Sequence, residues 1–195
     1  MTVQPVTLEG RVVRLEPLTL EHVEPLARVG LIPHLWTLQP TAINTVADMR
    51  RYVERALAEQ ENGVSLPFAI ISLDSGQVIG STRYMDIAPP HRRLEIGSTW
   101  LTPSSQRTGV NTEAKFLLLS HAFEELGVNR VVLKTEVPNE QSRNAILRLG
   151  AVQEGIFRQH MIADSGRFRD MVYFSILASE WPSVKARLNA SMARR

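Results

Sequence analysis

A strand, a polar loop and a long apolar helix follow one another near the middle of the chain, and this unit most constrains the fold. The strand candidate is Leu94 to Leu101, and the helix candidate runs from about Val110 to Leu126, before Gly127. Such a unit directs the unpaired backbone N–H groups of the first helical turn, and the positive end of the helix dipole, at whatever lies above the loop. This arrangement is typical of a phosphate-binding site.

The loop between strand and helix has a composition that suits an anion. Arg107 adds a forked cation that fits phosphate oxygens, and Gly109 allows a close backbone approach or a positive φ. The loop is not a Walker A loop, because no Lys-Ser/Thr pair follows the glycine, and its single glycine excludes the dinucleotide fingerprint. Taken alone, the loop is explained equally well as an ordinary helix entry that Asn111 or Thr112 caps.

The segment after the apolar helix adds a second strand–helix unit. Val131 to Val137 is β-branched and apolar, which predicts a strand that ends at Pro138. Asn139 then opens a helix that stops at Gly150. Because a helical crossover joins the Leu94 strand to this one, we expect the two strands to be parallel.

The pattern Q-x-x-G-x-N-T-E-A, followed by N-x-x-S-x-N-A and L-G-A-V-x-E-G, resembles the GNAT superfamily of N-acyltransferases. More narrowly it is similar to the RimJ/RimL type, which acetylates protein N-termini. The likeness extends from Gly10 to Pro182, and although each motif is loose, their order and spacing together are specific. The resemblance implies an α+β fold: a twisted mixed sheet of about seven strands, with helices on both faces and a splayed central pair of parallel strands.

The remaining elements are expected from periodicity and turn signals, and the short turns of the first half make its strands antiparallel. The expected strands are Arg11 to Glu16, Ser65 to Leu73, Gln77 to Met85, Ala151 to Met161 and Phe168 to Ala178. The expected helices are Thr19 or Glu21 to Val29, Val46 to Gln60 and Glu180 to Arg187. In the central helix, Glu113 is expected in a thin polar stripe with a structural role.

Composition limits the class of protein. The 195 residues are most simply one domain over 1–188, followed by a disordered basic tail over 189–195. A net charge of +2 does not indicate nucleic acid as a partner, and the absence of cysteine excludes a thiol nucleophile and a disulfide framework. No apolar run reaches membrane-spanning length and no signal-peptide pattern opens the chain, so a cytoplasmic protein with no membrane partner is expected.

The resemblance also assigns an acetyl-CoA site in the mouth of the V between the two central strands. The pantetheine arm is expected to pair with backbone of the first strand, and the diphosphate to lie on the loop and the helix start. The residues assigned to the cofactor in this way are Trp100, Leu101, Thr102, Gln106, Arg107, Thr108, Gly109, Val110, Asn111, Thr112, Asn139 and Ser142.

Catalytic roles follow from the same resemblance. Ser142 matches a serine that protonates the departing CoA thiolate, although a serine near a helix start often only bonds local backbone. Glu95 is the candidate base, with an ion pair to a neighbouring arginine as the equal alternative. A backbone N–H near Leu101 is the oxyanion candidate. Where RimL-type enzymes carry a base glutamate, this chain has Met161, and the adjacent His160 is a possible substitute.

The acceptor is expected to be a protein α-amine, such as the N-terminus of a ribosomal protein. An α-amine with a pKa of about 7.8 is neutral far more often at pH 7 than a lysine amine with a pKa of about 10.4, so it needs a weaker base. The segment from Gly30 to Thr45, with Trp36, and the late hairpin around Asp164 are expected to select the acceptor, unless Trp36 is a core plug.

Two rival functions remain open. One is an enzyme that uses a small-molecule amine or a succinyl donor, for which His91-Arg92-Arg93 is the nominated cluster. The other is a CoA-binding module without turnover. Either a monomer or a homodimer is compatible with the sequence. No two histidines have metal-ligand spacing, so no metal is expected.

Overall fold

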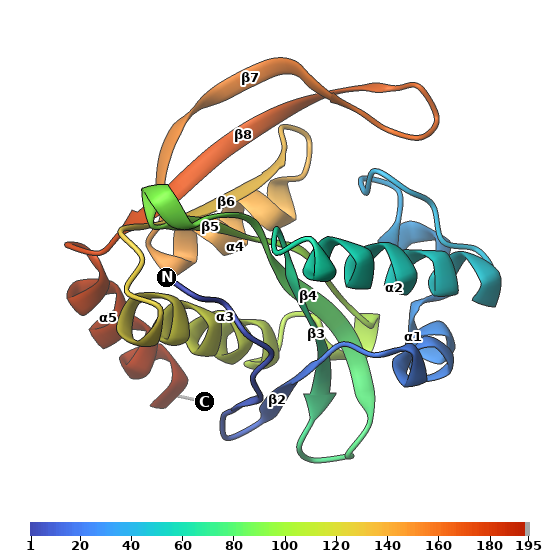
Figure 1. Ribbon diagram of the computed structural model, residues 1–195, viewed down its shortest axis with the longest axis horizontal. Coiled ribbons are helices and arrows are strands. Elements are labelled where there is room, and N and C mark those ends of the chain that lie inside the picture. Colours follow the sequence, from blue (N-terminus) through green and yellow to red (C-terminus); the bar gives the residue numbers. More distant parts are fainter. Residues whose placement is uncertain (194–195) are drawn as a thin grey trace.

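The computed structural model describes residues 1–193, which form eight strands and their covering helices around one sheet (Figure 1). The strands are β1 Leu8–Glu9, β2 Val13–Pro17, β3 Leu66–Ser72, β4 Val78–Ala88, β5 Arg93–Leu101, β6 Arg130–Glu136, β7 Val152–Ile162 and β8 Phe168–Leu177. The α-helices are α1 Val23–Gly30, α2 Val46–Glu61, α3 Val110–Ser120, α4 Glu140–Leu149 and α5 Trp181–Ala193. Short 3-10 turns are η1 Leu20–His22, η2 Pro33–Leu35, η3 Pro89–His91 and η4 Pro103–Ser105.

The strand order is β1-β2-β3-β4-β5-β6-β8-β7, and the only parallel neighbours in residues 1–193 are β5 and β6. The predicted mixed sheet, with antiparallel strands in the first half and a parallel central pair, is therefore confirmed. It has eight strands where about seven were expected, because the two-residue β1 pairs with the start of β2.

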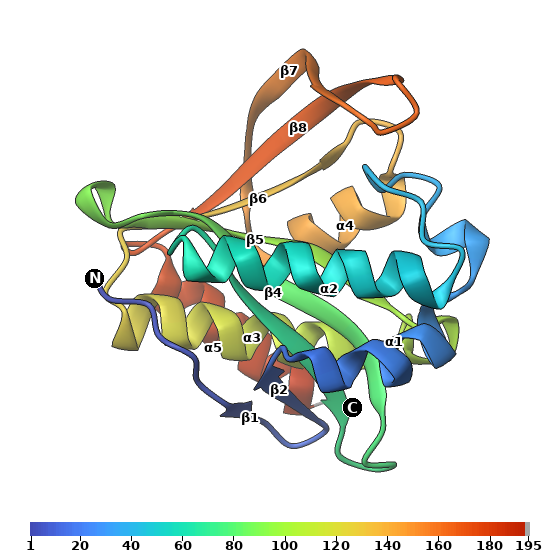
Figure 2. The same ribbon diagram turned by 45° about the vertical axis from the view of Figure 1, so that its right-hand side comes forward.

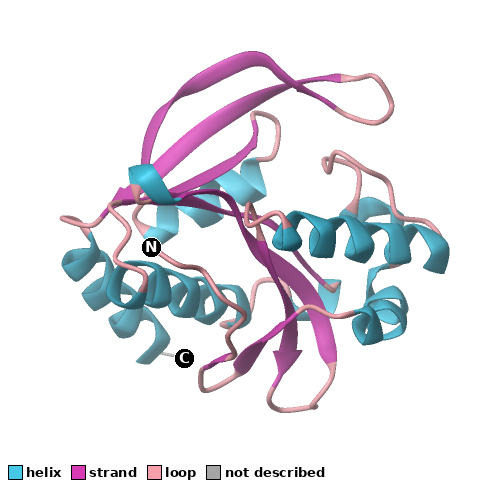
Figure 3. Cartoon of the chain, viewed as in Figure 1, coloured by secondary structure: helices cyan, strands magenta, loops and turns pink. Residues whose placement is uncertain are grey.

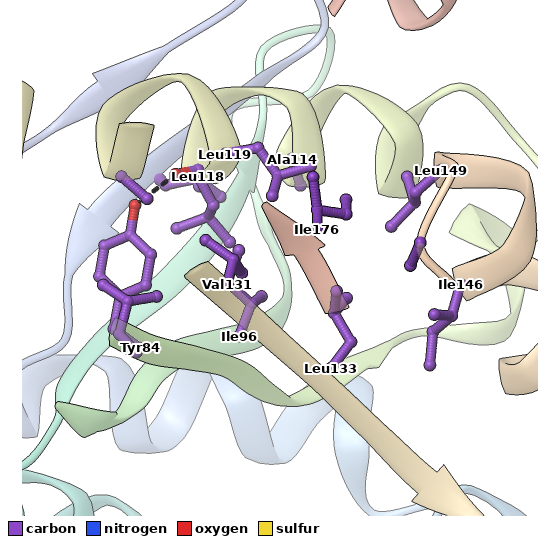
Figure 4. Packing of buried hydrophobic residues seen from close by; sticks show 14 of the residues in the cluster. Tyr84, Ile96, Ala114, Leu118, Leu119, Val131, Leu133, Ile146, Leu149 and Ile176 are labelled. Carbon is purple, nitrogen blue, oxygen red and sulfur yellow. Dashed lines mark hydrogen bonds between the residues drawn. The ribbon is translucent and has the colours of Figure 1, made fainter. Parts of the chain in front are cut away.

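Helices cover both faces of the sheet (Figures 2 and 3). Helices α1 and α2 pack on β3 and β4 over a core that includes Trp36, Met49 and Trp100. Helices α3, α4 and α5 cover the other face. There, Leu118 and Leu119 of α3 lie over the central strands (Figure 4). This central position explains why α3 is apolar on most sides, as an amphipathic surface helix would not be.

Two helix ends differ from the sequence prediction. The central helix changes its hydrogen-bond pattern after Ser120 and finishes as a π-helical segment, η5 His121–Glu125, before Gly127 at φ +63°. Helix α5 continues through Ala193, because Trp181, Val184 and Leu188 bury one side of it. The expectation of a disordered tail from residue 189 is therefore wrong as far as residue 193, and residues 194–195 lie outside the described residues.

Glu113 anchors the first turn of α3 to the start of the sheet. Its carboxylate accepts hydrogen bonds from the backbone N–H groups of Arg11, Val12 and Val13, at 2.8, 2.7 and 2.9 Å. A Cβ at Gly10 would lie 2.6 Å from the Glu113 carboxyl carbon, so a larger residue there would displace the carboxylate from these amides. The predicted structural role of Glu113 is confirmed. The Glu113 side chain is buried and does not lie in a polar stripe, because the three backbone amides take the place of hydrating water around its carboxylate.

We predict that Glu113→Ala lowers the free energy of unfolding by about 3 kcal/mol, because three partly buried amides lose a charged acceptor. Chemical denaturation measures this change. Glu125→Ala, at an exposed position of the same helical segment, is the control and should change stability by less than about 0.5 kcal/mol. Equal effects of the two substitutions would show that the Glu113 contacts contribute nothing.

Candidate active site

The candidate site begins where β5 and β6 part. The two strands pair in register only from Arg93↔Arg130 to Glu95↔Val132. Directly afterwards β5 has a bulge. Gly97 pairs with Arg83 and Trp100 pairs with Ser81, so β5 uses three residues where β4 uses two. Ser98 has φ +46° at this bulge. A bulge bends its strand and increases the local twist, and here it turns β5 away from β6 and opens the sheet.

The end of β5 presents backbone groups to this opening. The Thr102 N–H donates to the Ile79 carbonyl of β4 at 2.8 Å, so Thr102 faces β4. Because successive residues of a strand direct their N–H and C=O groups to opposite sides, those of Leu101 point away from β4 and into the opening. Of the three strand residues assigned to pantetheine, Leu101 is the one with backbone groups directed there. The Trp100 ring instead packs in the core beside Trp36.

Gln106 joins the end of β5 to the start of α4. Its side-chain amide donates to the Leu101 carbonyl at 3.0 Å, and its oxygen accepts from the Gln141 side chain at 3.3 Å. The two segments that were assigned to the two ends of acetyl-CoA are therefore adjacent in space. Gln141 itself was not among the residues nominated from the sequence.

In the loop before α3, the residue with a left-handed backbone is Arg107 and not Gly109. Arg107 has φ +60°, whereas Gly109 has φ −69° and is the N-cap of α3. Of the two possibilities given for Gly109, a positive φ is therefore not found, and the alternative cap by Asn111 or Thr112 is not formed because Gly109 itself is the N-cap. Arg107 is an exposed turn residue, and its left-handed conformation costs about 1–2 kcal/mol.

No side chain caps the start of α3. The first helical bond is from the Glu113 N–H to the Gly109 carbonyl, and Val110 N–H has only a 3.3 Å contact with the Thr108 hydroxyl. The N–H groups of Asn111 and Thr112 consequently have no acceptor inside the helix. Thr108 itself donates to the Ser105 carbonyl at 2.7 Å, which holds the loop in shape. Such a helix start suits an anion.

The start of α4 lies beside the same opening. Asn139 is its N-cap, and the Asn139 side chain accepts from the Ser142 N–H at 3.0 Å. The Ser142 hydroxyl has no hydrogen-bond partner among residues 1–193, so it does not make the local backbone bond that was its alternative role. It is available to a ligand.

Glu95 lies where the two strands part and is 3% exposed. Its carboxylate pairs with Lys134 Nζ of β6 at 2.9 Å, so the expected ion pair exists but with a lysine in place of an arginine. Burial raises the pKa of Glu95 above its ordinary value, and the Lys134 charge opposes that rise only in part. A carboxylate with a raised pKa accepts a proton more readily, which suits a general base.

Glu95 and His160 lie at the two ends of one row of side chains. Lys134 Nζ is 5.7 Å from the centre of the Tyr173 ring, and the Tyr173 hydroxyl is 2.9 Å from His160 Nε2. The row crosses β5, β6, β8 and β7 on one face of the sheet. His160 is exposed at its outer end, so two strands, β6 and β8, separate it from Glu95.

A buried lysine near the opening was not anticipated from the sequence. Lys115 lies on α3, which was interpreted as apolar around most of its surface, and it is 6% exposed. A single lysine within an apolar helical face was the one available signal, and it could equally have indicated a side chain that reaches solvent.

The acceptor side is bounded by two segments far apart in the sequence. The tip of the β7–β8 hairpin contacts the loop before α2, where the Asp164 N–H donates to the Pro40 carbonyl at 2.9 Å and Arg169 donates to the Leu38 carbonyl at 3.0 Å. Beside this contact is a cleft of about 620 Å³. It is lined by Thr41, Ala42, Asp48, Arg51, Tyr52, Arg55, Asp164 and Ser165.

Trp36 does not line this cleft. It is 5% exposed, its indole N–H donates to the Gly30 carbonyl at 2.7 Å, and its ring packs on Tyr52 and Trp100. Its burial favours the alternative that Trp36 is a core plug that shapes the acceptor-side loop from beneath.

The basic cluster nominated for a succinyl donor lies at the other end of β5. Arg92 donates to the Gly127 carbonyl, and Arg93 pairs with Asp86 at 2.6 Å. Both arginines therefore hold the β4–β5 turn. In the part of the chain that the structure describes, no three metal-ligating side chains gather, and no helix is both long and apolar enough to cross a membrane.

A family model described as "Acetyltransferase (GNAT) domain" matches residues 13–152, which is most of the chain and contains both central strands. The chain belongs to the GNAT acetyltransferase family. This assignment confirms the resemblance read from the loop and helix motifs, and it makes the chain a member of an N-acetyltransferase family.

Individual relatives agree with the assignment. YdaF of Bacillus subtilis (strain 168), to which a ribosomal N-acetyltransferase activity has been ascribed, is 34% identical over 58% of this chain and 61% of YdaF. The chain thus spans about three fifths of that relative. A ribosomal-protein-serine acetyltransferase of Escherichia coli (strain K12) is 30% identical over 71% of this chain and 78% of its own. Mycobacterium smegmatis RimJ, solved with CoA-disulfide, has a TM-score of 0.83 and 26% identity, covering 96% and 95% of the two chains.

We predict that Gly109→Glu abolishes CoA binding, because a carboxylate at the N-cap would occupy and repel the anion position at the start of α3. Isothermal titration with CoA measures the loss. Gly155→Glu is the matched control, since a side chain at Gly155 meets no atom within 4 Å. Undiminished binding by Gly109→Glu would show that this loop does not hold the diphosphate.

Proposed function

We propose that this protein transfers an acetyl group from acetyl-CoA to the α-amine of a protein N-terminus, in a ternary complex. The observation that carries the proposal is the opening between β5 and β6, which leads from Glu95, past the Leu101 N–H that points into it, to the uncapped start of α3.

The residues at this opening fit an acyl-CoA. A pantetheine amide can pair with the Leu101 backbone as an added strand pairs with a sheet edge. The amides of Asn111 and Thr112 can bind a diphosphate. The nearest carboxylate on α3, that of Glu113, is turned to the amides of residues 11–13 and is hydrogen-bonded there. Donors therefore face the phosphate position while the acidic side chain is occupied elsewhere.

Acyl-CoA supplies an activated acyl group as a thioester. The acceptor nitrogen forms the new C–N bond, the C–S bond breaks, and the proton lost by nitrogen passes to Glu95 directly or through water. Ser142 gives its hydroxyl proton to the departing thiolate and recovers one from solvent. The Leu101 N–H is directed at the opening and can stabilise charge on the acyl oxygen. Holding the two reactants together supplies several kcal/mol of the remaining barrier.

The choice of an α-amine follows from the modest base. Glu95 is tied to Lys134, and an α-amine needs little help because a substantial fraction is already neutral at pH 7. The names of the relatives YdaF and the Escherichia coli enzyme support a ribosomal-protein acceptor. The cleft between α2 and the β7–β8 tip provides hydrogen-bonding side chains of both charges for such a peptide.

CoA release measured across N-terminal peptides, polyamines and aminoglycosides tests this function. We expect turnover with peptides that carry a free N-terminus and none with the same peptides after N-terminal blocking. Reaction of the small amines alone would reject the protein acceptor. CoA binding without turnover on any amine would reject an enzyme and favour a CoA-binding module.

We predict that Ser142→Ala lowers turnover by about tenfold or more while CoA affinity changes little, because the free hydroxyl acts on the leaving thiolate. Steady-state kinetics and calorimetry separate the two effects. Ser183→Ala, at an exposed site on α5, is the control. Turnover equal to that of the unmodified protein would remove the acid role of Ser142.

A further inference from the structure

Lys115 places a buried amine directly behind the bulge of β5. From the second turn of α3, its Nζ lies 2.5 Å from the Thr99 hydroxyl and 3.5 Å from that of Thr82. The two hydroxyls are 2.8 Å apart, so one amine and two threonines form a compact polar cluster inside an apolar layer.

The cluster is attached to the residues that open the sheet. The Thr99 hydroxyl is also 3.3 Å from the Gly97 carbonyl, and Ser98, with its left-handed backbone, lies between these two residues. The Lys115 amine of α3 thus contacts one end of the turn that bends β5 away from β6, and the Thr99 hydroxyl links that end to the Gly97 carbonyl at the other.

No carboxylate within residues 1–193 forms an ion pair with Lys115. The charge that bears on it is that of Glu95, which is already paired with Lys134. Burial lowers the pKa of Lys115 to about 7. An apolar side chain of the same length would avoid the cost of burying this amine, so stability alone does not explain it.

We propose that Lys115 is a positioning residue for acyl transfer: from behind β5 it fixes the Gly97–Thr99 bulge and adds positive charge next to the thioester position. The inference rests on the proposed function, because it places the acyl group at the point where β5 and β6 part. A fixed charge beside a developing oxyanion stabilises it without reorganisation, which is most effective in a dry interior.

The other titratable groups around Lys115 define what a pH profile can report. The charge of Glu95 on β5 acts on the amine, Lys134 of β6 is the ion-pair partner of Glu95, and Glu113 lies two residues earlier on α3. Further along the helix are Tyr84 of β4, whose pKa burial raises, and His121, whose pKa burial lowers. Of these, Lys115 is the group that loses a positive charge as the pH rises through about 7.

The test compares Lys115→Met, which keeps the length and removes the charge, with Lys115→Arg, which keeps a charge at every accessible pH. Lys185→Met is the control, since Lys185 is a half-exposed lysine on α5 paired with Glu124. The measurements are CoA affinity by calorimetry, the melting temperature, and kcat against pH with the peptides that the enzyme accepts. An NMR titration of the Lys115 ammonium gives a readout that needs no turnover.

We predict that Lys115→Met lowers kcat by about tenfold or more, with CoA affinity within about threefold and a melting temperature that does not fall. The unmodified enzyme should lose rate at alkaline pH as Lys115 deprotonates, and that limb should be absent in Lys115→Arg, which retains part of kcat. The NMR titration should have its midpoint near pH 7, well below that of an exposed lysine.

Three results would overturn the inference. The first is a kcat of Lys115→Met within about twofold of the unmodified enzyme. The second is a parallel loss of CoA affinity and melting temperature with an unchanged pH profile, which would indicate a purely structural residue. The third is a Lys115 ammonium that titrates as an exposed lysine does. If no amine at all is acetylated, the proposed function fails and this inference fails with it, whereas each of the three results above can be obtained while peptides are still acetylated.

Discussion

The parting of β5 from β6 is the constraint on which the candidate site depends. A closed parallel pair would use its backbone groups in the sheet, and no strand edge would remain at the centre of the molecule. The bulge at Gly97–Thr99 ends the pairing after three residue pairs and leaves Leu101 directed into the opening. Glu95 lies at the last of these pairs, and therefore at the inner end of the opening.

Helix α3 supports that opening at both ends. Its first turn is held to the start of β2 by Glu113, which leaves the amides of Asn111 and Thr112 exposed to an anion. Its second turn contacts the bulge through Lys115. One buried helix thus fixes the distance between the anion position and the point where the strands part, which a flexible loop could not do.

Sequence patterns were sufficient for the elements and for the central topology. Alternation and turn signals located seven of the eight strands, and the helical crossover determined the parallel pair. They could not locate the bulge, since the residues around Ser98 read as a continuous strand and the left-handed turn depends on contacts with α3 and β4. The end of α5 was also missed, because its burial depends on how the helix packs against α3.

The candidate site, like the fold, was predicted in part. The loop lies beside the start of α4 through the contact of Gln106 with Gln141, and the cofactor roles of the loop, Asn139 and Ser142 stay predictions. The partners that determine chemistry were less accessible to sequence reasoning. Lys134 as the partner of Glu95, Gln141 as the partner of Gln106, and the amine of Lys115 all depend on three-dimensional contacts between segments at least 16 residues apart. Trp36 is the opposite case: the sequence nominated it for the acceptor site, and the structure places it in the core.

The wall on the acceptor side is made by two surface segments that meet through only a few polar contacts, among them those of Pro40 with Asp164 and of Leu38 with Arg169. Neither segment contributes to the bulge or to the anchor of α3. Sequence changes in these two segments can therefore alter the acceptor side while the bulge and the anchor of α3 are preserved. Related proteins can differ in the amine that they accept through changes in these two segments alone, while the strands and helix around the β5–β6 opening keep their structure.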